Sequence, residues 1–407
     1  MKKAERQIDR RRFIRTGLTG LTGAALTPTL LKASSGDKSP SIQEKDGFIY
    51  RKFGKTGLTL PIVSMGVMNA DNPNLVAGAL DSGIVHLDTA HGYQKGRNEE
   101  MIGEVIKNRK RDSLVLSTKV AYSKDRQTGL YPEGTTIDTF QNEFDISLKR
   151  LGVDYVDIIY IHSFWVRDVV LFEPAMKFLE RAKKQGKARF IGFTTHRNEH
   201  EMLDAAVESK FYEVVLTGYN FRQKNHKEIA AAMARASQAG IGIVAMKTQA
   251  GVFWDKERKE PINMKASLKW ALNNKHVHTA IPGFTTFDQM NLDIGVMEDL
   301  TLTAQEKTDL RLDGEQAGSG LYCQQCETCL TQCPADLDIP TLMRSYMYAY
   351  GYRNQSLARE TLDSMKIANL PCEDCSRCRV ECSMGFDIQE KAKDINRLKS
   401  VPTEFLG

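Results

Sequence analysis

The chain has 407 residues, of which 41% are hydrophobic and 26% are charged. A single core seldom grows beyond about 250–300 residues, so this length predicts one large domain and one smaller domain. The composition is typical of a globular protein and excludes a disordered or membrane-embedded chain. The formal charge of +5 is carried largely by Met1–Arg15, so we expect no nucleic-acid partner.

The first residues have the layout of an export signal. Uncharged Thr16–Leu31 follows the basic stretch and precedes polar Lys32–Lys38. This uncharged segment is shorter than the about 20 residues of an ordinary membrane-spanning helix. We expect no transmembrane span outside this region.

Within the basic stretch, Arg10–Arg15 resembles the twin-arginine motif, with a paired Arg, a spacer, Phe, an aliphatic residue and a further basic residue. The resemblance implies that residues 1–33 direct export of a folded, cofactor-loaded protein to the periplasm or the outer face of the cytoplasmic membrane. Signal cleavage and retention as an anchor both stay open, and a basic surface helix is the alternative. Residues 34–47 are rich in Ser, Gly, Lys and Asp and predict a linker.

From about Leu58 to about Leu312, short β-branched or apolar runs alternate with amphipathic helical stretches. The strand runs are residues 61–65, 84–88, 114–119, 156–162, 189–194, 213–217, 241–247 and 279–282. The glycines at the expected helix ends are Gly83, Gly152, Gly186 and Gly240. Eight such units predict an α/β fold, a (β/α)8 TIM barrel over residues 48–315. No G-x-G-x-x-G follows the first run, which disfavours a Rossmann fold.

Polar side chains end three consecutive strand runs. Asp88 closes the second run, Lys119 the third and His162 the fourth, and Tyr93 lies in the loop after Asp88. The C-terminal strand ends carry the chemistry of such barrels, so we expect these side chains to meet at one mouth. Taken singly, they have structural interpretations as a cap, an ion-pair partner and a buried histidine. Those interpretations do not explain why four polar groups converge on an apolar barrel.

This set, with the runs at residues 88–93 and 98–103, resembles the catalytic tetrad of the aldo/keto reductase superfamily. The resemblance covers the whole barrel and implies reduction of a carbonyl or oxidation of an alcohol, with Tyr93 as general acid/base. Lys119 would lower the pKa of Tyr93 by favouring phenolate, and Asp88 would hold Lys119. His162 would bind or polarise the carbonyl oxygen. The implied substrate is a small carbonyl compound or alcohol.

The resemblance also implies a nicotinamide cofactor, NADP or NAD, across the barrel mouth. The corresponding positions are Thr194, Thr195, Tyr219, Asn220, Met246, Lys247, Pro282 and Gly283. Several of them depart from the family pattern: Thr194-Thr195 replaces Ser-Asn, and Met246 replaces a ring-stacking Tyr. Leu216 stands where Gln is common, and Phe284–Thr286 lacks the Arg or Lys expected at a 2'-phosphate. The choice between NADP and NAD stays open.

All eight cysteines lie beyond residue 320, in two groups with the same C-x2-C-x2-C-x3-C spacing. The groups are Cys323, Cys326, Cys329 and Cys333, and Cys372, Cys375, Cys378 and Cys382. This spacing favours two [4Fe-4S] clusters over zinc sites or strained disulfides. In the two-cluster ferredoxins that it resembles, the fourth cysteine of each run binds the other cluster. The resemblance therefore implies that Cys382 joins the first three cysteines and Cys333 joins the later three.

Residues 316–407 predict a small, mostly α-helical ferredoxin-like domain, with helices over Leu342–Met365. Three functions stay open for the two domains together. The first is an oxidoreductase whose clusters exchange electrons with a partner protein, and the second is a nicotinamide enzyme whose clusters are structural. The third is an iron–sulfur electron carrier or binding protein on a barrel that has lost nicotinamide binding. Hydride transfer moves two electrons and a cluster takes one, yet the sequence shows no flavin signature.

Overall fold

The computed structural model describes residues 42–125, 128–254, 259–312, 323, 325–367, 370–372, 375 and 378–406. Residues 1–33, which carry the predicted export signal, lie outside these ranges. Among the described residues, no helix has both the length and the apolar character needed to cross a membrane.

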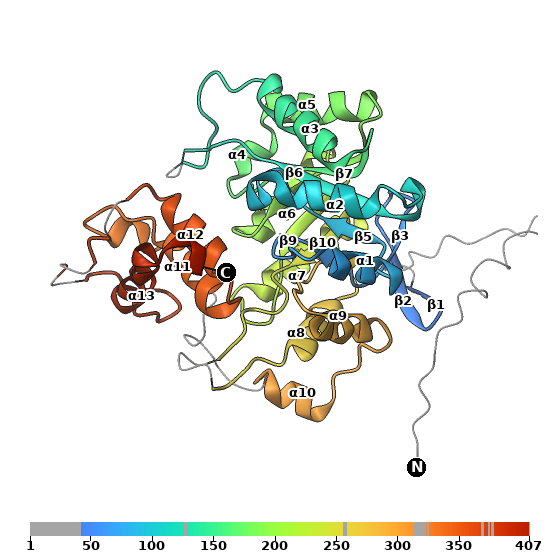
Figure 1. Cartoon of the computed structure of the whole chain (residues 1–407). Helices are drawn as coiled ribbons and strands as arrows, with labels where there is room; N and C mark the ends of the chain where they lie inside the picture. The colour runs from blue at the N-terminus through green and yellow to red at the C-terminus, as the bar shows by residue number, and fades with distance from the viewer. Residues whose placement is uncertain are drawn as a thin grey trace, which may run out of the picture. The chain divides into compact units, whose positions relative to one another are not determined.

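Eight parallel strands form a nearly closed barrel (Figure 1). In chain order they are β4 (Met65–Gly66), β5 (His86–Asp88), β6 (Val115–Val120), β7 (Val156–Ile161), β8 (Ala188–Thr195), β9 (Val214–Gly218), β10 (Gly242–Met246) and β11 (Thr279–Ala280). A parallel bridge between Val63 and Ala280 joins the two edges, and the amide of Gly66 donates to the carbonyl of Pro282 at 3.0 Å. The structure confirms the predicted TIM barrel.

The strands are buried on both faces, as parallel strands covered by helices must be. Every residue of β6 and β7 is buried. The covering helices are α1 (Pro73–Asp81), α2 (Arg97–Ile106), α3 (Ile137–Leu151), α4 (Arg167–Val170), α5 (Glu173–Lys184), α6 (Glu199–Ser209), α7 (His226–Gln238), α8 (Met264–Leu272), α9 (Phe287–Ile294) and α10 (Ala304–Asp309). Inside the barrel, Tyr160, Leu216 and Val244 pack together.

Local sequence signals explain where the helices stop. α3 begins at a capping box on Thr136 and ends at Gly152, whose φ of 63° lies in the left-handed region. A residue with a β-carbon is disfavoured there, so glycine ends the helix without strain. Gly83, Gly186 and Gly240 also have positive φ, as predicted for helix ends.

A small antiparallel sheet precedes the barrel. Its strands are β1 (Ile42–Lys45), β2 (Phe48–Lys52) and β3 (Thr59–Pro61). Phe53 and Leu60, at the end of this sheet, pack into the barrel interior. β1 lies within residues 34–47, which the sequence predicts to be a linker. Residues 43–45 are exposed and have no apolar alternation, and main-chain pairing with β2 makes the strand.

The C-terminal region is helical in its described parts. It contains α11 (Ile339–Tyr346), the π-helical turn η5 (Met347–Gly351), α12 (Gln355–Asp363) and α13 (Ile388–Asn396). Leu342, Leu362 and Ile395 form its core. These helices confirm the predicted mostly α-helical domain.

Several contacts join this region to the barrel. Arg197 forms an ion pair with Glu327, and Lys224 donates to the carbonyl of Ser383 at 2.9 Å. Met68 packs on the helical core, 4.0 Å from the hydroxyl of Tyr348. The barrel residues in these contacts all lie in loops that follow strands. The helical region therefore lies over the mouth where the strands end.

Substitution of Gly192 by alanine should destabilise the barrel. Gly192 pairs with Val214 across β8 and β9, and an added β-carbon would overlap the carbonyl oxygen of Val214. Such overpacking costs about 1–3 kcal/mol or more, so we expect a lower midpoint of thermal unfolding by circular dichroism. Gly295→Ala is the control, because a β-carbon there meets nothing within 4 Å. Equal midpoints for both variants would contradict this packing.

Candidate active site and cysteine pockets

Four side chains from neighbouring elements meet at the mouth of the barrel. Asp88 ends β5, Lys119 lies near the end of β6, and His162 directly follows β7. Tyr93 begins the short helix η1 (Tyr93–Gly96) in the loop after β5. Because β5, β6 and β7 are adjacent in the sheet, their ends bring these side chains together.

Lys119 and Asp88 form a buried ion pair, with each side chain only 2% exposed. The ammonium also donates to the carbonyl of Thr89 at 2.7 Å, and the hydroxyl of Ser117 donates to Asp88 at 2.6 Å. Both charges are thus hydrogen-bonded as well as paired, which a buried ion pair requires.

The ion pair lies next to Tyr93. The Lys119 nitrogen is 5.0 Å from the centre of the Tyr93 ring, and the rings of Tyr93 and His162 are 6.2 Å apart at 80°. The phenol, ammonium, carboxylate and imidazole therefore share one site. This is the arrangement that a carbonyl group would need between a proton donor and a second hydrogen-bonding group.

The pKa of Tyr93 differs from the sequence-based expectation. Burial raises the pKa of this phenol more than the charge of Lys119 lowers it, so the pKa lies above its usual value. The charge of Lys119 acts in the expected direction and lowers the pKa, but the loss of water around the buried phenol outweighs it. Burial alone would lower the pKa of Lys119, but Asp88 and Tyr93 raise it above the usual value.

His162 is neutral at physiological pH. Burial is the largest cause that lowers its pKa to about 3, and the positive charges of Lys119, Lys124, Arg344 and Lys247 contribute to the same shift. The ammonium of Lys124 donates to the carbonyl of His162 at 3.2 Å. A neutral imidazole in this site presents one N–H donor and one acceptor nitrogen.

Three residues at this mouth were missed by the sequence-based interpretation: Lys124, His196 and Arg344. His196 directly follows β8, so the strand-end rule that found the tetrad could have found it. Its pKa is lowered by burial and by nearby positive charges that include Lys247 and Arg344. Arg344 comes from α11 in the helical region, and no sequence signal places it beside the barrel.

The two threonines expected at the nicotinamide carboxamide lie at the end of β8 and are buried. The Thr194 oxygen accepts a hydrogen bond from the amide of Ser163, and the Thr195 hydroxyl donates to the carbonyl of Arg197. Thr194 therefore keeps a free donor and Thr195 a free acceptor. A carboxamide could use one donor and one acceptor of this kind.

The other expected cofactor residues lie at or just after the ends of β9, β10 and β11, which are neighbours in the sheet. Tyr219 packs on Trp270 with ring centres 5.0 Å apart, and Asn220 donates to the carbonyl of Lys247. Met246 lies against the barrel interior, and Lys247 is half-buried. Pro282 is buried, and Gly283 is exposed.

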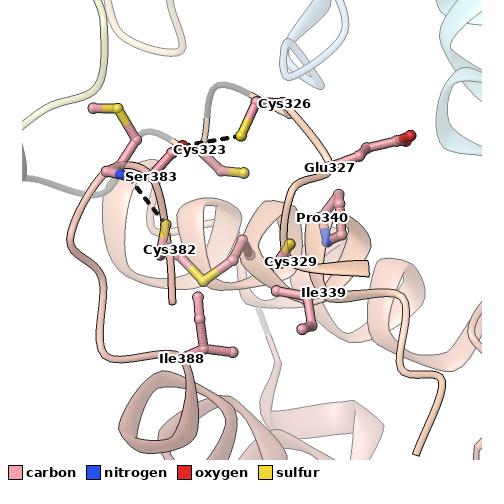
Figure 2. Close-up of a pocket in the computed structure, with 11 residues that line it drawn as sticks. Cys323, Cys326, Glu327, Cys329, Ile339, Pro340, Cys382, Ser383 and Ile388 are labelled. Atoms are coloured by element: carbon pink, nitrogen blue, oxygen red, sulfur yellow. Dashed lines mark hydrogen bonds between the residues drawn. The ribbon is translucent and has the colours of Figure 1, made fainter. Parts of the chain in front are cut away.

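Four cysteines line one pocket of about 330 Å³, a volume that includes its opening (Figure 2). They are Cys323, Cys326, Cys329 and Cys382. Ile339 and Ile388 add apolar walls, and the hydroxyl of Ser383 lies 3.0 Å from the sulfur of Cys326. The set combines three cysteines of the first run with the last cysteine of the second run.

A second pocket, of about 390 Å³, contains the remaining four cysteines. They are Cys333, Cys372, Cys375 and Cys378. The structure thus groups the cysteines in the two crossed sets that the ferredoxin resemblance implies. All eight are described, and none forms a disulfide.

The chemistry of both pockets fits a metal cluster. Burial, with the neighbouring thiolates, raises the pKa of Cys323 to about 11 and that of Cys372 to about 11. Four thiolates in an apolar pocket are unfavourable without positive charge, which iron would supply. Four sulfur donors per pocket match the ligand number of a [4Fe-4S] cluster.

Comparison with known proteins identifies both regions. Residues 63–267 match the aldo/keto reductase family, and residues 322–387 match a 4Fe-4S dicluster domain. The L-glyceraldehyde 3-phosphate reductase of Escherichia coli K12 is 34% identical over 163 residues, which are 37% of this chain and 46% of that protein. Aldo-keto reductase yakc [NADP(+)] of Schizosaccharomyces pombe is 32% identical over 155 residues, 35% of this chain and 44% of that protein.

The matched part spans just under half the length of each of these relatives. Among solved structures, the holo form of aldo-keto reductase AKR11C1 from Bacillus halodurans superposes with a TM-score of 0.53 at 19% identity. That alignment covers 68% of this chain and 98% of that one, which shows the shared fold. Because the family match spans half of the 407 residues, the chain belongs to the aldo/keto reductase family and carries a 4Fe-4S dicluster domain.

Proposed function

We propose that the protein is an oxidoreductase that reduces a small carbonyl compound, or oxidises the corresponding alcohol, at the barrel mouth. The convergence of Tyr93, Lys119, Asp88 and His162 carries this proposal. The barrel would extend over residues 48–315, and the ferredoxin-like domain over residues 316–407.

In the proposed reaction, a carbonyl oxygen lies between Tyr93 and His162. Charge develops on this oxygen during reduction, and donors already aimed at it stabilise that charge. Tyr93 gives its phenolic proton to the oxygen, and the N–H of neutral His162 donates a hydrogen bond to it. In the oxidative direction, Tyr93 takes the proton from the alcohol.

Lys119 and Asp88 support this proton transfer without touching the substrate. The ammonium of Lys119 stabilises the phenolate that Tyr93 becomes after giving up its proton. Asp88 keeps Lys119 charged and fixed in position. Because burial raises the pKa of Tyr93, its phenol stays protonated at neutral pH and can act as the acid.

The hydride would come from NADPH or NADH, and Thr194 and Thr195 would hold the carboxamide of that nucleotide. Their unused donor and acceptor support this assignment. Tyr219 packs on Trp270, and the side chain of Asn220 donates to the carbonyl of Lys247. Because both side chains already have partners in the protein, they favour the second candidate function, an iron–sulfur carrier on a barrel that has lost nicotinamide binding. Nucleotide affinity of the purified protein distinguishes the two functions.

We further propose that the two cysteine pockets each hold one [4Fe-4S] cluster and that these clusters exchange electrons with a partner protein. The four sulfur donors in each pocket support this proposal. The exposed position of Cys326 and Cys378 leaves part of each cluster accessible to such a partner.

Replacement of Tyr93 by phenylalanine should lower the turnover number for carbonyl reduction by about 10²–10⁴-fold, because the proton donor is lost and the ring is kept. The reductase rate of the unchanged protein should fall only above about pH 10, where a phenol of raised pKa loses its proton. Steady-state rates from pH 6 to 11 test both expectations. Unchanged turnover in Tyr93→Phe would remove Tyr93 from the mechanism.

Replacement of Cys382 by serine should empty the pocket that contains Cys323 and leave the other cluster in place. The iron content of anaerobically reconstituted protein should fall from about eight to about four atoms per chain. Ser383→Ala is the control, because it removes a contact to Cys326 and no ligand, so both clusters should remain. Loss of the cluster at Cys372 in Cys382→Ser would show that the crossed sets are incorrect.

We also propose export by the twin-arginine route to the periplasm or the outer face of the cytoplasmic membrane, since Arg10–Arg15 matches that motif. Conversion of Arg10 and Arg11 together to lysine should keep the folded protein in the cytoplasmic fraction, whereas Arg6→Lys should not. Immunoblots of cell fractions from a host with this translocase measure the difference. Equal export of both variants would rule out the twin-arginine signal.

A further inference from the structure

The two cysteine runs differ at the residue that follows the fourth cysteine. Pro334 follows Cys333 in the first run, and Ser383 follows Cys382 in the second. Proline is the usual residue at this place in such runs and offers no side-chain donor. Because the fourth cysteines are exchanged, Ser383 lines the pocket that contains Cys326, the first pocket, and Pro334 lines the second. The hydroxyl of Ser383 therefore distinguishes the first pocket from the second.

The Ser383 hydroxyl is placed to donate to a cluster ligand. Its oxygen lies 3.0 Å from the sulfur of Cys326 (Figure 2). A thiolate that binds iron has no proton to give, so the hydroxyl is the donor. The hydroxyl of Thr328 lies 3.5 Å from the same sulfur. Two hydroxyl groups thus converge on one thiolate.

Main-chain amides contact two more sulfurs of the same set. The amide of Gln325 donates to the sulfur of Cys323 at 3.4 Å, and the amide of Met384 donates to the sulfur of Cys382 at 3.4 Å. Reduction adds one negative charge to a cluster, and hydrogen bonds to its sulfurs stabilise that charge. The surroundings of the first pocket therefore favour the reduced state of the proposed cluster.

The barrel holds the segment that carries this hydroxyl. The ammonium of Lys224, in the loop between β9 and α7, donates to the carbonyl of Ser383 at 2.9 Å. A positive charge thus lies on the residue whose hydroxyl contacts Cys326. Lys224 acts on the proposed cluster in two ways, because it fixes the position of Ser383 and because its charge favours an added electron.

A second barrel loop neutralises a carboxylate at the first pocket. Glu327 lines this pocket, and its negative charge alone would disfavour reduction of a cluster there. Arg197, which lies in the loop after β8, pairs with Glu327. The hydroxyl of Thr195 donates to the carbonyl of Arg197 at 2.9 Å, so this loop is tied to the end of β8. Loops after the neighbouring strands β8 and β9 therefore both contact residues of the first pocket.

We propose that Ser383 and Lys224 tune the cluster of the first pocket, so that its reduction potential is higher than the four cysteine ligands alone would give. Ser383 donates the hydrogen bond to the Cys326 thiolate, and Lys224 positions Ser383 from the barrel. Both are positioning residues and bind no iron. The barrel thereby controls one of the two clusters. The inference rests on the proposed clusters and is independent of the proposed reductase activity.

Redox titrations of the reconstituted full-length protein, followed by electron paramagnetic resonance, test this proposal. In Ser383→Ala, one of the two reduction steps should move to a more negative potential, and the other should stay. The equilibrium between reduced and oxidised cluster should shift by at least about fivefold, which is about 40 mV for one electron at about 59 mV per tenfold. Ser383→Thr keeps the hydroxyl and should restore the original potential.

The lysine contact has its own test. Lys224→Gln should move the same reduction step in the same direction, because Ser383 loses its contact with the barrel and a positive charge is lost. Lys227→Gln is the matched control, since it removes an exposed lysine at the start of α7 and keeps the contact to Ser383. Lys224→Gln leaves every residue of the pocket in place, so it decides the question should Ser383→Ala lose iron.

Three results would overturn the proposal. They are unchanged potentials in Ser383→Ala, equal shifts of both reduction steps in that variant, and equal shifts in Lys224→Gln and Lys227→Gln. Protein that stays free of iron after reconstitution would refute the proposed clusters as well. Two intact clusters with unchanged potentials would refute the tuning role alone.

Discussion

The ion pair between Lys119 and Asp88 is the interaction on which the barrel mouth depends. Both side chains are almost fully removed from water, and neither charge could stay there alone. Removal of one partner from a buried pair costs about 3–5 kcal/mol, because the other charge is left uncompensated. The parallel register of β5 and β6 holds the two residues side by side. The same pair fixes an ammonium beside Tyr93 and so sets the electrostatics of the proposed proton donor.

The two halves of the chain depend on each other at this mouth. The helical region supplies the walls and the sulfur atoms of both pockets, and each pocket takes its fourth cysteine from the other run. This exchange ties segments about fifty residues apart into one unit. Tyr348 of this unit then contacts Met68 of the barrel. A barrel without the attached domain would lack this contact.

Much of this architecture could be predicted because it is encoded locally. The strands predicted from short apolar runs overlap the observed strands, and Gly152 correctly marked the end of α3. β1 was missed because main-chain pairing makes it, with no apolar pattern in residues 43–45. The direction of the pKa shift of Tyr93 was also missed, since it depends on how much water the folded chain removes from the phenol. The packing of the Tyr219 ring on Trp270 likewise depends on how the end of β9 lies against α8.

The sequence by itself determined the barrel, the four polar residues near its strand ends and the two cysteine runs, because period and spacing along the chain define them. The tertiary structure alone decided which groups share a site. It brought the positive charge of Arg344 near enough to lower the pKa of His162, and it divided the cysteines between two pockets. Burial and charge in these places come from segments distant in sequence. No local sequence pattern shows the sum of these contributions, which lowers the pKa of His162.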